Sequence, residues 1–398
     1  MKNQENCDNI KWVYICIPKS ENKKQIYFSY FGGFEMEKLK IGIIGCGGIA
    51  TGKHLPSLAK LSDKIEMVAF CDIIEEKAVD CAKRFGTPDA KVYTDYKELL
   101  KDESISVVHV LTPNRSHSFI TVDALEAGKH VMCEKPMAIN SAEAKKMLDA
   151  AERTGKKLTI GYQNRQRPDS LYMKTEADNG TFGDIYYARA TALRRRGVPT
   201  WGVFIKEYEQ GGGPLIDIGT HALDLTLWMM QNYKPKYCVG STFHKLNSQT
   251  ENQGNCFGNW DPANFTVEDS AFGFIVMENG ATITLESSWA LNIADFNEAV
   301  TTICGTKAGA DMNGGLKING IRNNSPYILR PDLNAGGVAF FSGNSNEAPA
   351  DREARLWIDS IINDTEPFVK PLEAYTVTRI LEGIYESAKT GEAYYFKD

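Results

Sequence analysis

The pattern of apolar and polar residues changes part way along the chain. From residue 39 to about residue 165, short apolar runs alternate with stretches in which apolar residues recur at helical spacing. This alternation is typical of a parallel sheet whose connecting helices cover both faces. Gly128 and Gly155 follow two helical stretches as C-terminal stops, and Ser141 is expected to begin one. The predicted strands are residues 39–45, 66–72, 91–93, 106–111, 130–133 and 158–162, and the predicted helices are 75–85, 96–101, 116–127 and 141–153.

Beyond residue 165 the alternation extends over longer stretches separated by turn-forming residues, which predicts an antiparallel sheet with one covered face. Glu278-Asn279-Gly280 indicates a tight hairpin. Residues 247–264, rich in Asn, Gln and Gly, are expected to form an exposed loop, either a lid, a subunit contact or a plain insertion. The predicted strands are 184–193, 237–245, 269–277, 281–291 and 300–305, and two amphipathic helices are predicted at 351–363 and 372–390.

The first 35 residues fit neither pattern. Residues 12–18 form an apolar stretch of seven, which barely meets the minimum for a signal-peptide core. Polar sequence surrounds this stretch, and no convincing small-residue cleavage site follows it. We therefore expect an N-terminal extension at residues 1–35, a first domain at residues 36–165 and a second domain at residues 166–398.

Composition excludes several classes of protein. The 398 residues are 42% hydrophobic, which is enough for a large core. A formal net charge of -6 gives no electrostatic case for binding nucleic acid, and no apolar run reaches the roughly 20 residues that span a bilayer. The nine cysteines are widely spread without a Cys-x-x-Cys motif. Neither a disulfide framework nor a zinc knuckle is therefore predicted, and a reducing cytoplasm fits best.

A glycine-rich turn follows the first predicted strand and precedes a helix. Gly45 permits the tight turn, Gly47 lets the backbone approach a pyrophosphate, and Ala50 allows close packing of helix on strand. The next strand ends in Asp72, about where a dinucleotide site presents its ribose acceptor. The charge of Asp72 would repel a 2′-phosphate and no arginine follows it, so NAD is predicted as the cofactor rather than NADP.

Polar groups follow two further parallel strands, at the ends where ligands bind in such sheets. Thr112-Pro113-Asn114 follows one strand and Glu134-Lys135-Pro136 follows the next. An ammonium group beside the nicotinamide could hydrogen-bond a reacting hydroxyl and stabilise developing negative charge, although lysines in this position are more often simply solvated. The predicted cofactor-binding residues are Gly45, Cys46, Gly47, Gly48, Ile49, Asp72, Leu111, Thr112, Pro113, Asn114, His117, Glu134 and Lys135.

Three glycines at 211–213 and then Pro214 predict the start of another helix. Asp217, His221 and Asp224 have the spacing i, i+4 and i+7, which places them on one face of it. His221 is suited to accept a hydroxyl proton, and Asp217 could orient the ring or hold substrate. The alternatives are a buried histidine satisfied by a carboxylate and a metal site, but no third ligand has suitable spacing, so no metal is predicted.

Substrate contacts are expected between the two domains. Gln163 and Arg165 follow the last parallel strand, while an arginine cluster at residues 194–196 precedes Trp201. Such a cluster is usually a solvated face, yet arginine donors and an indole platform also suit a polyhydroxylated ring. The predicted substrate-binding residues are Gln163, Arg165, Arg196, Trp201, Asp217 and His221.

These motifs together resemble the glucose-fructose oxidoreductase / inositol dehydrogenase (Gfo/Idh/MocA) family over nearly all of residues 36–398. The matching pieces are residues 45–50, Thr112-Pro113-Asn114 with His117, Glu134-Lys135-Pro136, and Asp217 with His221. The resemblance implies an α/β fold with two parts: an N-terminal NAD-binding Rossmann domain, and a C-terminal α/β domain for substrate binding and oligomerisation. The first has a doubly wound parallel sheet, and the second has a large, mostly antiparallel open-faced sheet that commonly builds dimers or tetramers. For residues 1–35 the resemblance provides no role.

The resemblance also implies that Lys135, Asp217 and His221 form the catalytic group, with His221 as the proton acceptor and Lys135 positioning the hydroxyl. The expected function is NAD-dependent hydride transfer at a secondary hydroxyl of a sugar, glycoside or cyclitol, with C3 of a glycoside as the specific hypothesis. One alternative is a glycoside hydrolase that uses NAD transiently, by oxidation and elimination. Another is a nucleotide-binding sensor that has lost its chemistry.

Overall fold

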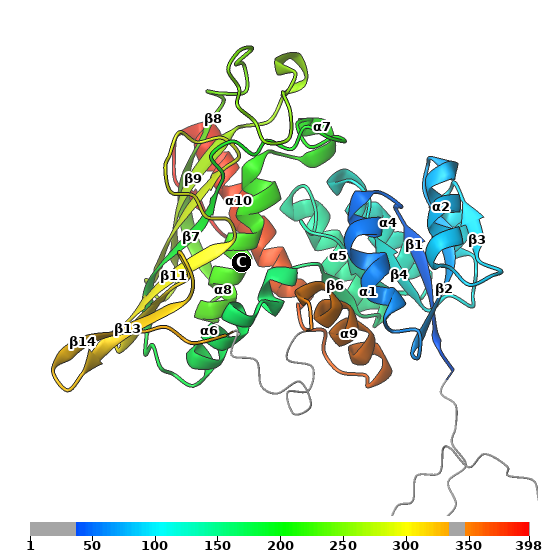
Figure 1. The fold of residues 1–398 in the computed structure, drawn as a ribbon, viewed down its shortest axis with the longest axis horizontal. Helices are drawn as coiled ribbons and strands as arrows, with labels where there is room; N and C mark the ends of the chain where they lie inside the picture. The colour runs from blue at the N-terminus through cyan, green and yellow to red at the C-terminus, as the bar shows by residue number, and fades with distance from the viewer. Residues whose placement is uncertain (1–36, 334–346, 398) are drawn as a thin grey trace, which may run out of the picture. The chain divides into compact units, whose positions relative to one another are not determined.

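In the computed structural model, which describes residues 37–333 and 347–397, two β-sheets organise the fold (Figure 1). The first sheet has six parallel strands among the described residues, in the order β3-β2-β1-β4-β5-β6. This is the doubly wound strand order of a dinucleotide-binding fold, so the predicted parallel sheet is confirmed. The strands are β1 Leu39–Ile44, β2 Ile65–Cys71, β3 Lys91–Tyr93, β4 Val107–Val110, β5 His130–Cys133 and β6 Leu158–Ile160. The predicted extension at residues 1–35 lies outside the described residues.

The helices of this first part begin and end close to their predicted limits. Helix α5 begins at Ser141, as predicted, and the side chain of Asn140 caps it by accepting the Glu143 N–H at 2.8 Å. Gly155 ends the helix at φ +66°, as predicted. The elements are the π-helical η1 Ala50–His54, α1 Leu55–Ala59, α2 Glu75–Phe85, α3 Tyr96–Leu100, α4 Asn114–Glu126 and α5 Ser141–Thr154.

The second sheet has nine strands among the described residues, in the order β14-β13-β12-β11-β7-β10-β9-β8-β15. Every neighbouring pair is antiparallel except β7 with β10, so the predicted mostly antiparallel sheet is confirmed. The strands are β7 Ile185–Leu193, β8 Pro235–Phe243, β9 Ser270–Met277, β10 Thr282–Ser288, β11 Val300–Gly305, β12 Ala308–Asp311, β13 Lys317–Arg322, β14 Ser325–Leu329 and β15 Tyr394–Tyr395. The predicted hairpin joins β9 to β10, where Gly280 has φ +85°.

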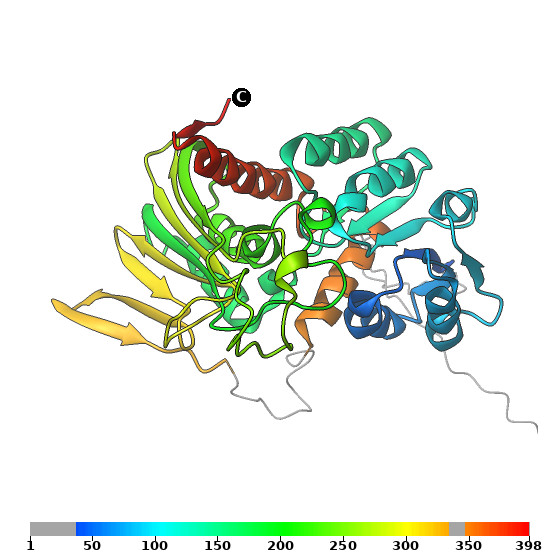
Figure 2. The ribbon, with the colours of Figure 1, turned by 90° about the horizontal axis from the view of Figure 1, so that it is seen from above.

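Helices α8 and α10 cover one face of the second sheet, on the side toward the first part of the fold (Figures 1 and 2). Helix α9 follows strand β14 of the second sheet in the chain, yet its Trp357 and Ile358 belong to the same core cluster as Ile41 and Phe70 of the first sheet. The elements are η2 Gln163–Gln166, α6 Pro168–Asp178, α7 Glu207–Gln210, π-helical η3 Leu215–Gly219, α8 Thr220–Met230, η4 Pro262–Asn264, α9 Pro349–Ile362 and α10 Pro371–Thr390. None of the helices within the described ranges is long and apolar enough to cross a membrane.

The segment at residues 247–264 is less exposed than predicted. Gln253 and Trp260 are buried within it, and the Gln253 side chain accepts the Trp260 backbone N–H at 2.8 Å. The indole of Trp260 donates to the Asn247 carbonyl at 3.1 Å and lies edge-on to the ring of Phe265. The loop therefore has a small core of its own, which a polar composition conceals.

Candidate active site

The glycine-rich turn after β1 has the geometry that a dinucleotide needs. Gly45 has φ +96°, and a Cβ there would lie 2.6 Å from the Leu111 carbonyl oxygen, so only glycine fits. A Cβ at Gly47 or Gly48 would meet nothing within 4 Å, so the turn is open on that side. Helical structure begins at Gly48 and runs through η1 and α1. The open turn at a helix N-terminus therefore fits a pyrophosphate.

Asp72 lies directly after β2, beside this turn. Its Oδ2 accepts the Cys46 N–H at 2.8 Å, and its Oδ1 accepts the Ile74 N–H at 2.9 Å. Two backbone donors thus orient a carboxylate that stays partly exposed. Its remaining lone pairs can accept hydrogen bonds from ribose hydroxyls, which fits the predicted role.

The buried ring of His117 joins the loops that follow β4 and β5. Its Nδ1 lies 2.8 Å from the Pro136 carbonyl oxygen, and its Nε2 lies 2.8 Å from the Thr112 carbonyl oxygen. Burial lowers the pKa of His117, and a neutral ring carries one N–H, so it donates to one carbonyl at a time. His117 is 0% exposed, so in this structure its ring holds the two loops together, and its predicted contact with the cofactor stays a prediction. Asn114 is also buried and donates to the Gln210 carbonyl at 3.0 Å.

Glu134 is likewise buried and turned toward protein groups. Its Oε1 lies 2.7 Å from Lys53 Nζ and 2.7 Å from His54 Nε2, and its Oε2 accepts the Lys135 N–H at 3.0 Å. Three of the roughly four lone-pair positions of the carboxylate are thus used inside the protein, and its contact with the cofactor stays a prediction. Glu134 also holds the backbone of its neighbour.

Lys135 and Asp217 meet across the two parts of the fold. Lys135 Nζ lies 2.9 Å from Asp217 Oδ1 and donates to the Asp217 carbonyl at 2.9 Å. The second carboxylate oxygen of Asp217 accepts the indole N–H of Trp289 at 3.0 Å, and Trp289 is fully buried. Burial would raise the pKa of Asp217, but the charges of Lys135 and then Arg194 lower it. Asp217 is thus held as an anion that fixes the ammonium group.

His221 lies in the first turn of α8, four residues after Asp217. Its Nδ1 is buried and has no hydrogen-bond partner among the described residues. The ring lies edge-on to Tyr162, with centroids 6.2 Å apart. Burial, and then the charge of Lys135, lowers the pKa of His221 to about 3. The ring is therefore a neutral imidazole, and its unpartnered nitrogen is unlike that of a histidine satisfied by a carboxylate.

The depressed pKa of His221 predicts a dependence of stability on pH. A histidine in the unfolded chain has a pKa of about 6.5, so between pH 6.5 and 3 the unfolded state binds the extra proton. The free energy of unfolding should therefore fall by about 1.4 kcal/mol between pH 8 and pH 5.5 through this residue alone. Urea unfolding of His221→Asn at both pH values should show a fall smaller by that amount. Replacement of the exposed His244 by asparagine is the control, and an equal fall in both variants would contradict the prediction.

Trp289 is a site residue that the sequence pattern did not reveal, because it marks position 289 only as apolar. Trp289→Phe keeps a ring but removes the N–H that Asp217 Oδ2 accepts. Leaving a buried acceptor without its donor costs about 1–3 kcal/mol, so kcat should fall by at most the roughly 5–150-fold that this energy represents. The pKa of Asp217 should rise, so the acidic limb of the kcat profile should move to higher pH. Trp260→Phe removes a buried indole N–H that donates to the Asn247 carbonyl and not to Asp217, so it should leave kcat and its pH profile unchanged.

Glu268 explains how the helix with Asp217 begins. Its Oε2 accepts the Gly213 N–H at 2.8 Å, and its Oε1 accepts from Leu215 N at 3.2 Å and from the Tyr385 hydroxyl at 2.8 Å. A Cβ at Gly212 would lie 2.1 Å from the Tyr385 hydroxyl oxygen, and one at Gly213 would lie 2.3 Å from the Glu268 carbonyl oxygen. These two glycines allow close approach of a buried carboxylate and a tyrosine, which the sequence did not indicate.

Arg165, predicted to bind substrate, is turned into the protein interior. Its side chain is 0% exposed, and its Nε and Nη2 donate to the Asp224 carboxylate at 2.9 and 2.6 Å. Its Nη1 donates to Glu373 of α10 at 2.6 Å. The donors therefore form an internal ion pair between η2, α8 and α10. Asp224, predicted on the same face as His221, is used in this pair.

The other predicted substrate residues remain at the surface or near it. Gln163 accepts a hydrogen bond from Lys53 Nζ at 3.2 Å. Arg196 donates to the Gln253 carbonyl at 3.0 Å. Trp201 is 52% exposed and packs edge-on against Phe257, with centroids 4.8 Å apart. Their contact with substrate stays a prediction.

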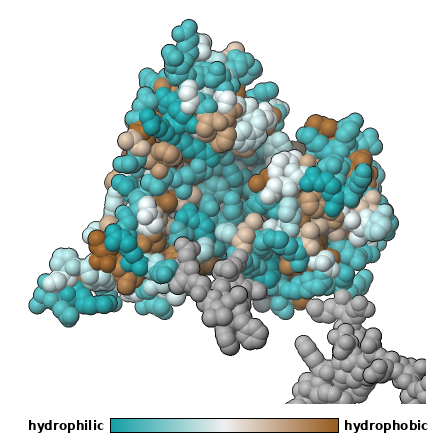
Figure 3. Space-filling view, in the orientation of Figure 1, coloured by the Kyte–Doolittle hydropathy of each residue, from teal (hydrophilic) through white to brown (hydrophobic). Residues whose placement is uncertain are grey.

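The surface is hollowed between the part built on the second sheet and the part built on the first, and hydrophilic residues line most of the hollow (Figure 3). Within the described ranges, no three His, Cys, Asp or Glu side chains are grouped as metal ligands. The arrangement combines an open nucleotide turn with an ammonium, a carboxylate and a neutral imidazole. Those groups can remove a proton from an alcohol and stabilise the charge that develops on its oxygen.

Comparison with known proteins agrees with this chemistry. Residues 39–162 match the description "Oxidoreductase family, NAD-binding Rossmann fold", and residues 171–311 match "GFO/IDH/MocA C-terminal domain". A D-glucoside 3-dehydrogenase of Escherichia coli (strain K12) is 36% identical over 89% of this chain and 96% of its own length. An inositol 2-dehydrogenase of Salmonella typhimurium is 31% identical over 49% of this chain and 56% of its own.

A solved structure of levoglucosan dehydrogenase, described as a complex with NADH and levoglucosan, has the same fold. Its TM-score is 0.74 at 22% sequence identity, and the match covers 90% of this chain and 99% of that one. The levoglucosan dehydrogenase of Pseudarthrobacter phenanthrenivorans is 27% identical over 64% of this chain and 68% of its own length.

Proposed function

The chain belongs to the Gfo/Idh/MocA family of NAD-binding oxidoreductases, and on this premise we propose that it moves a hydride between a secondary hydroxyl of a carbohydrate and nicotinamide. The substrate class is a sugar, glycoside or cyclitol, and the specific hypothesis is C3 of a glycoside. The observation that carries the proposal is the ion pair of Lys135 with Asp217, one helical turn from the unpartnered Nδ1 of His221. The names of the relatives support the same substrate class.

Each of these residues has a defined part in the proposed reaction. Bound NAD supplies the carbon that accepts the hydride. His221, neutral in the folded chain, takes the hydroxyl proton as the carbon–hydrogen bond breaks. Lys135 donates a hydrogen bond to the same oxygen and stabilises its developing negative charge, while Asp217 keeps the ammonium in place. In the reverse direction the protonated imidazole returns the proton.

The test is mass spectrometry of products formed from a panel of free sugars, cyclitols and O- and C-glycosides, with and without added NAD. We expect one substrate class to lose two hydrogens while NADH accumulates. NMR of the borodeuteride-reduced product then locates the oxidised carbon. Release of the aglycone without net NADH formation would favour the NAD-assisted hydrolase instead. Absence of any product across the panel, despite measurable NAD binding, would favour a sensor and overturn the proposal.

We further propose that the chain works in the cytoplasm as a homo-oligomer, a dimer or a tetramer. The face of the second sheet opposite α8 and α10 carries exposed apolar side chains, among them Val239, Phe274 and Tyr395. Contiguous apolar surface of this kind is typical of an interface. Light scattering coupled to size exclusion should give a multiple of the 398-residue mass. Phe274→Glu should shift the protein toward the monomer, and a monomeric parent protein would contradict the proposal.

A further inference from the structure

A buried chain of charged groups lies behind the proposed catalytic lysine, and it begins at Lys53. This residue is in η1, directly after the glycine-rich turn, and its side chain is only 11% exposed. Its Nζ lies 2.7 Å from Glu134 Oε1, 3.0 Å from Glu353 Oε2 and 3.2 Å from Gln163 Oε1. Three acceptors match the three N–H donors of an ammonium group. Lys53 is therefore fully used inside the protein.

Glu134 connects Lys53 to Lys135, because it contacts both residues. Its Oε1 also lies 2.7 Å from His54 Nε2, and its Oε2 accepts the backbone N–H of Lys135 at 3.0 Å. Burial would raise the pKa of Glu134, but the charge of Lys53 holds it well below its usual range. The carboxylate is consequently ionised and fixed by three donors. It holds the peptide group from which the Lys135 side chain extends.

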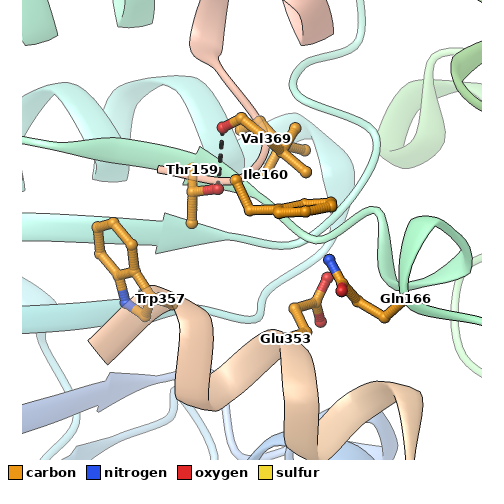
Figure 4. A pocket seen from close by; sticks show the side chains of 7 residues that line it. Thr159, Ile160, Gln166, Glu353, Trp357 and Val369 are labelled. Carbon is orange, nitrogen blue, oxygen red and sulfur yellow. Dashed lines mark hydrogen bonds between the residues drawn. The ribbon is translucent and has the colours of Figure 1, made fainter. Parts of the chain in front are cut away.

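Glu353 of helix α9 lies at the other end of this series of charged groups. It is 9% exposed, and only one of its two oxygens, Oε2, contacts Lys53. Its Oε1 is buried and has no partner among the described residues. The residue lines a cavity of about 10 Å³ with Gln166, Thr159 and Trp357 (Figure 4). A space of about this size accepts one water molecule, which could satisfy the free oxygen.

We propose that Lys53 and Glu353 are positioning residues for hydride transfer: Glu353 directs the Lys53 ammonium to Glu134, and Glu134 fixes the backbone of Lys135. The inference rests on the proposed role of Lys135. It links the helix that follows the nucleotide turn, the loop after β5 and helix α9, which come from three distant parts of the chain. The cofactor-binding turn and the reacting lysine are thereby held in a fixed position relative to each other. Neither Lys53 nor Glu353 needs to touch substrate or cofactor for this role.

Three variants test whether these charged groups position Lys135. Lys53→Met leaves Glu134 and Glu353 buried without their shared cation, so kcat should fall at least tenfold while the Kd for NAD changes less than threefold. The pKa of Glu134 should rise, so the acidic limb of the kcat profile should move to higher pH, which a loss of folded protein alone would not cause. Lys53→Arg keeps the charge and should recover part of kcat. Glu353→Gln keeps the Lys53–Glu134 pair and should lower kcat about threefold to tenfold.

Lys64→Met is the matched control. Lys64 pairs with Asp359 of the same helix α9 at 2.7 Å, but it contacts neither Glu134 nor Glu353. It should leave kcat and its pH profile unchanged. If Lys53→Met does not fold, the comparison of Glu353→Gln with Lys64→Met decides. Unchanged kcat and pH profiles in Glu353→Gln, and in Lys53→Met where it folds, with Lys135→Met inactive, would overturn this inference and spare the proposed function, whereas an active Lys135→Met would remove the proposed function itself.

Discussion

Lys135→Met is expected to lower kcat for carbohydrate oxidation about a thousandfold and to leave the Kd for NAD within threefold. Methionine keeps the length and apolar character of the lysine stem, so the variant mainly removes the ammonium group. The hydrogen bond and charge that it directs at a developing oxyanion correspond to about 10²–10³ in kcat for a single donor. Asp217 Oδ1 also loses its cation at 2.9 Å, which adds to the effect. The nucleotide turn around Gly45 and Asp72 is untouched.

Single-turnover absorbance of NADH and calorimetric titration with NAD measure the two quantities separately. Lys129→Met is the matched control, because Lys129 is also buried, precedes the same strand β5 and donates to the Asp102 carbonyl at 2.8 Å. That control should retain kcat, apart from any loss of folded protein. Turnover by Lys135→Met close to that of the parent would rule out the proposed mechanism. Loss of NAD binding together with turnover would instead show that Lys135 acts through the cofactor site.

The fold was predictable where apolar residues are buried in regular patterns. The strands of the first sheet are nearly continuous apolar runs, as expected for strands covered on both faces, and all six predictions begin and end within two residues of the observed limits. Strands β13 and β14 were missed because most of their residues are exposed and carry no alternating pattern. Helix α6 was missed for a related reason, since only Ser170 and Met173 of it are buried.

The candidate site was predictable where one motif contains both the residue and the reason for it. The turn at Gly45 and the pair Asp217 and His221 are of this kind, because their spacing along one element already implies their geometry. Trp289 and Glu353 could not be found in this way. Each acts on a residue at least 70 positions away in the chain, so only the packing of separate elements brings the partners together. A buried carboxylate or indole has no local signature in a single sequence.

Arg165 shows the opposite case: its position suggested a role in substrate binding, and the structure gives its donors to carboxylates instead. It follows β6 and the predicted last parallel strand, where ligands commonly bind, and arginine is a good donor to sugar hydroxyls. The sequence also contained Asp224, but it was assigned to the helix face of His221. The structure pairs the two residues instead, because α8 and η2 pack against each other inside the protein. Burial of a cation requires such a partner, and its donors are then no longer free.

Arg165→Met should therefore lower stability and leave substrate affinity nearly unchanged. The substitution leaves the carboxylates of Asp224 and Glu373 without the cation that lies 2.6 Å from each, and Asp224 is 1% exposed. Removal of one partner from a buried ion pair lowers the free energy of unfolding by about 3–5 kcal/mol. As a control, Arg84→Met breaks an exposed ion pair with Asp80 on helix α2 and should change the free energy of unfolding by less than about 1 kcal/mol.

Urea unfolding measures this difference, and the KM for the carbohydrate separates the two possible roles of Arg165. If the guanidinium bound substrate, its removal would raise KM and would change the unfolding midpoint no more than Arg84→Met does. That result would restore the role predicted from the sequence. The double variant Arg165→Met with Asp224→Asn should recover part of the lost stability, because it removes the unpaired negative charge as well. Recovery in the double variant would tie the loss to this ion pair rather than to the altered volume of the side chain at position 165.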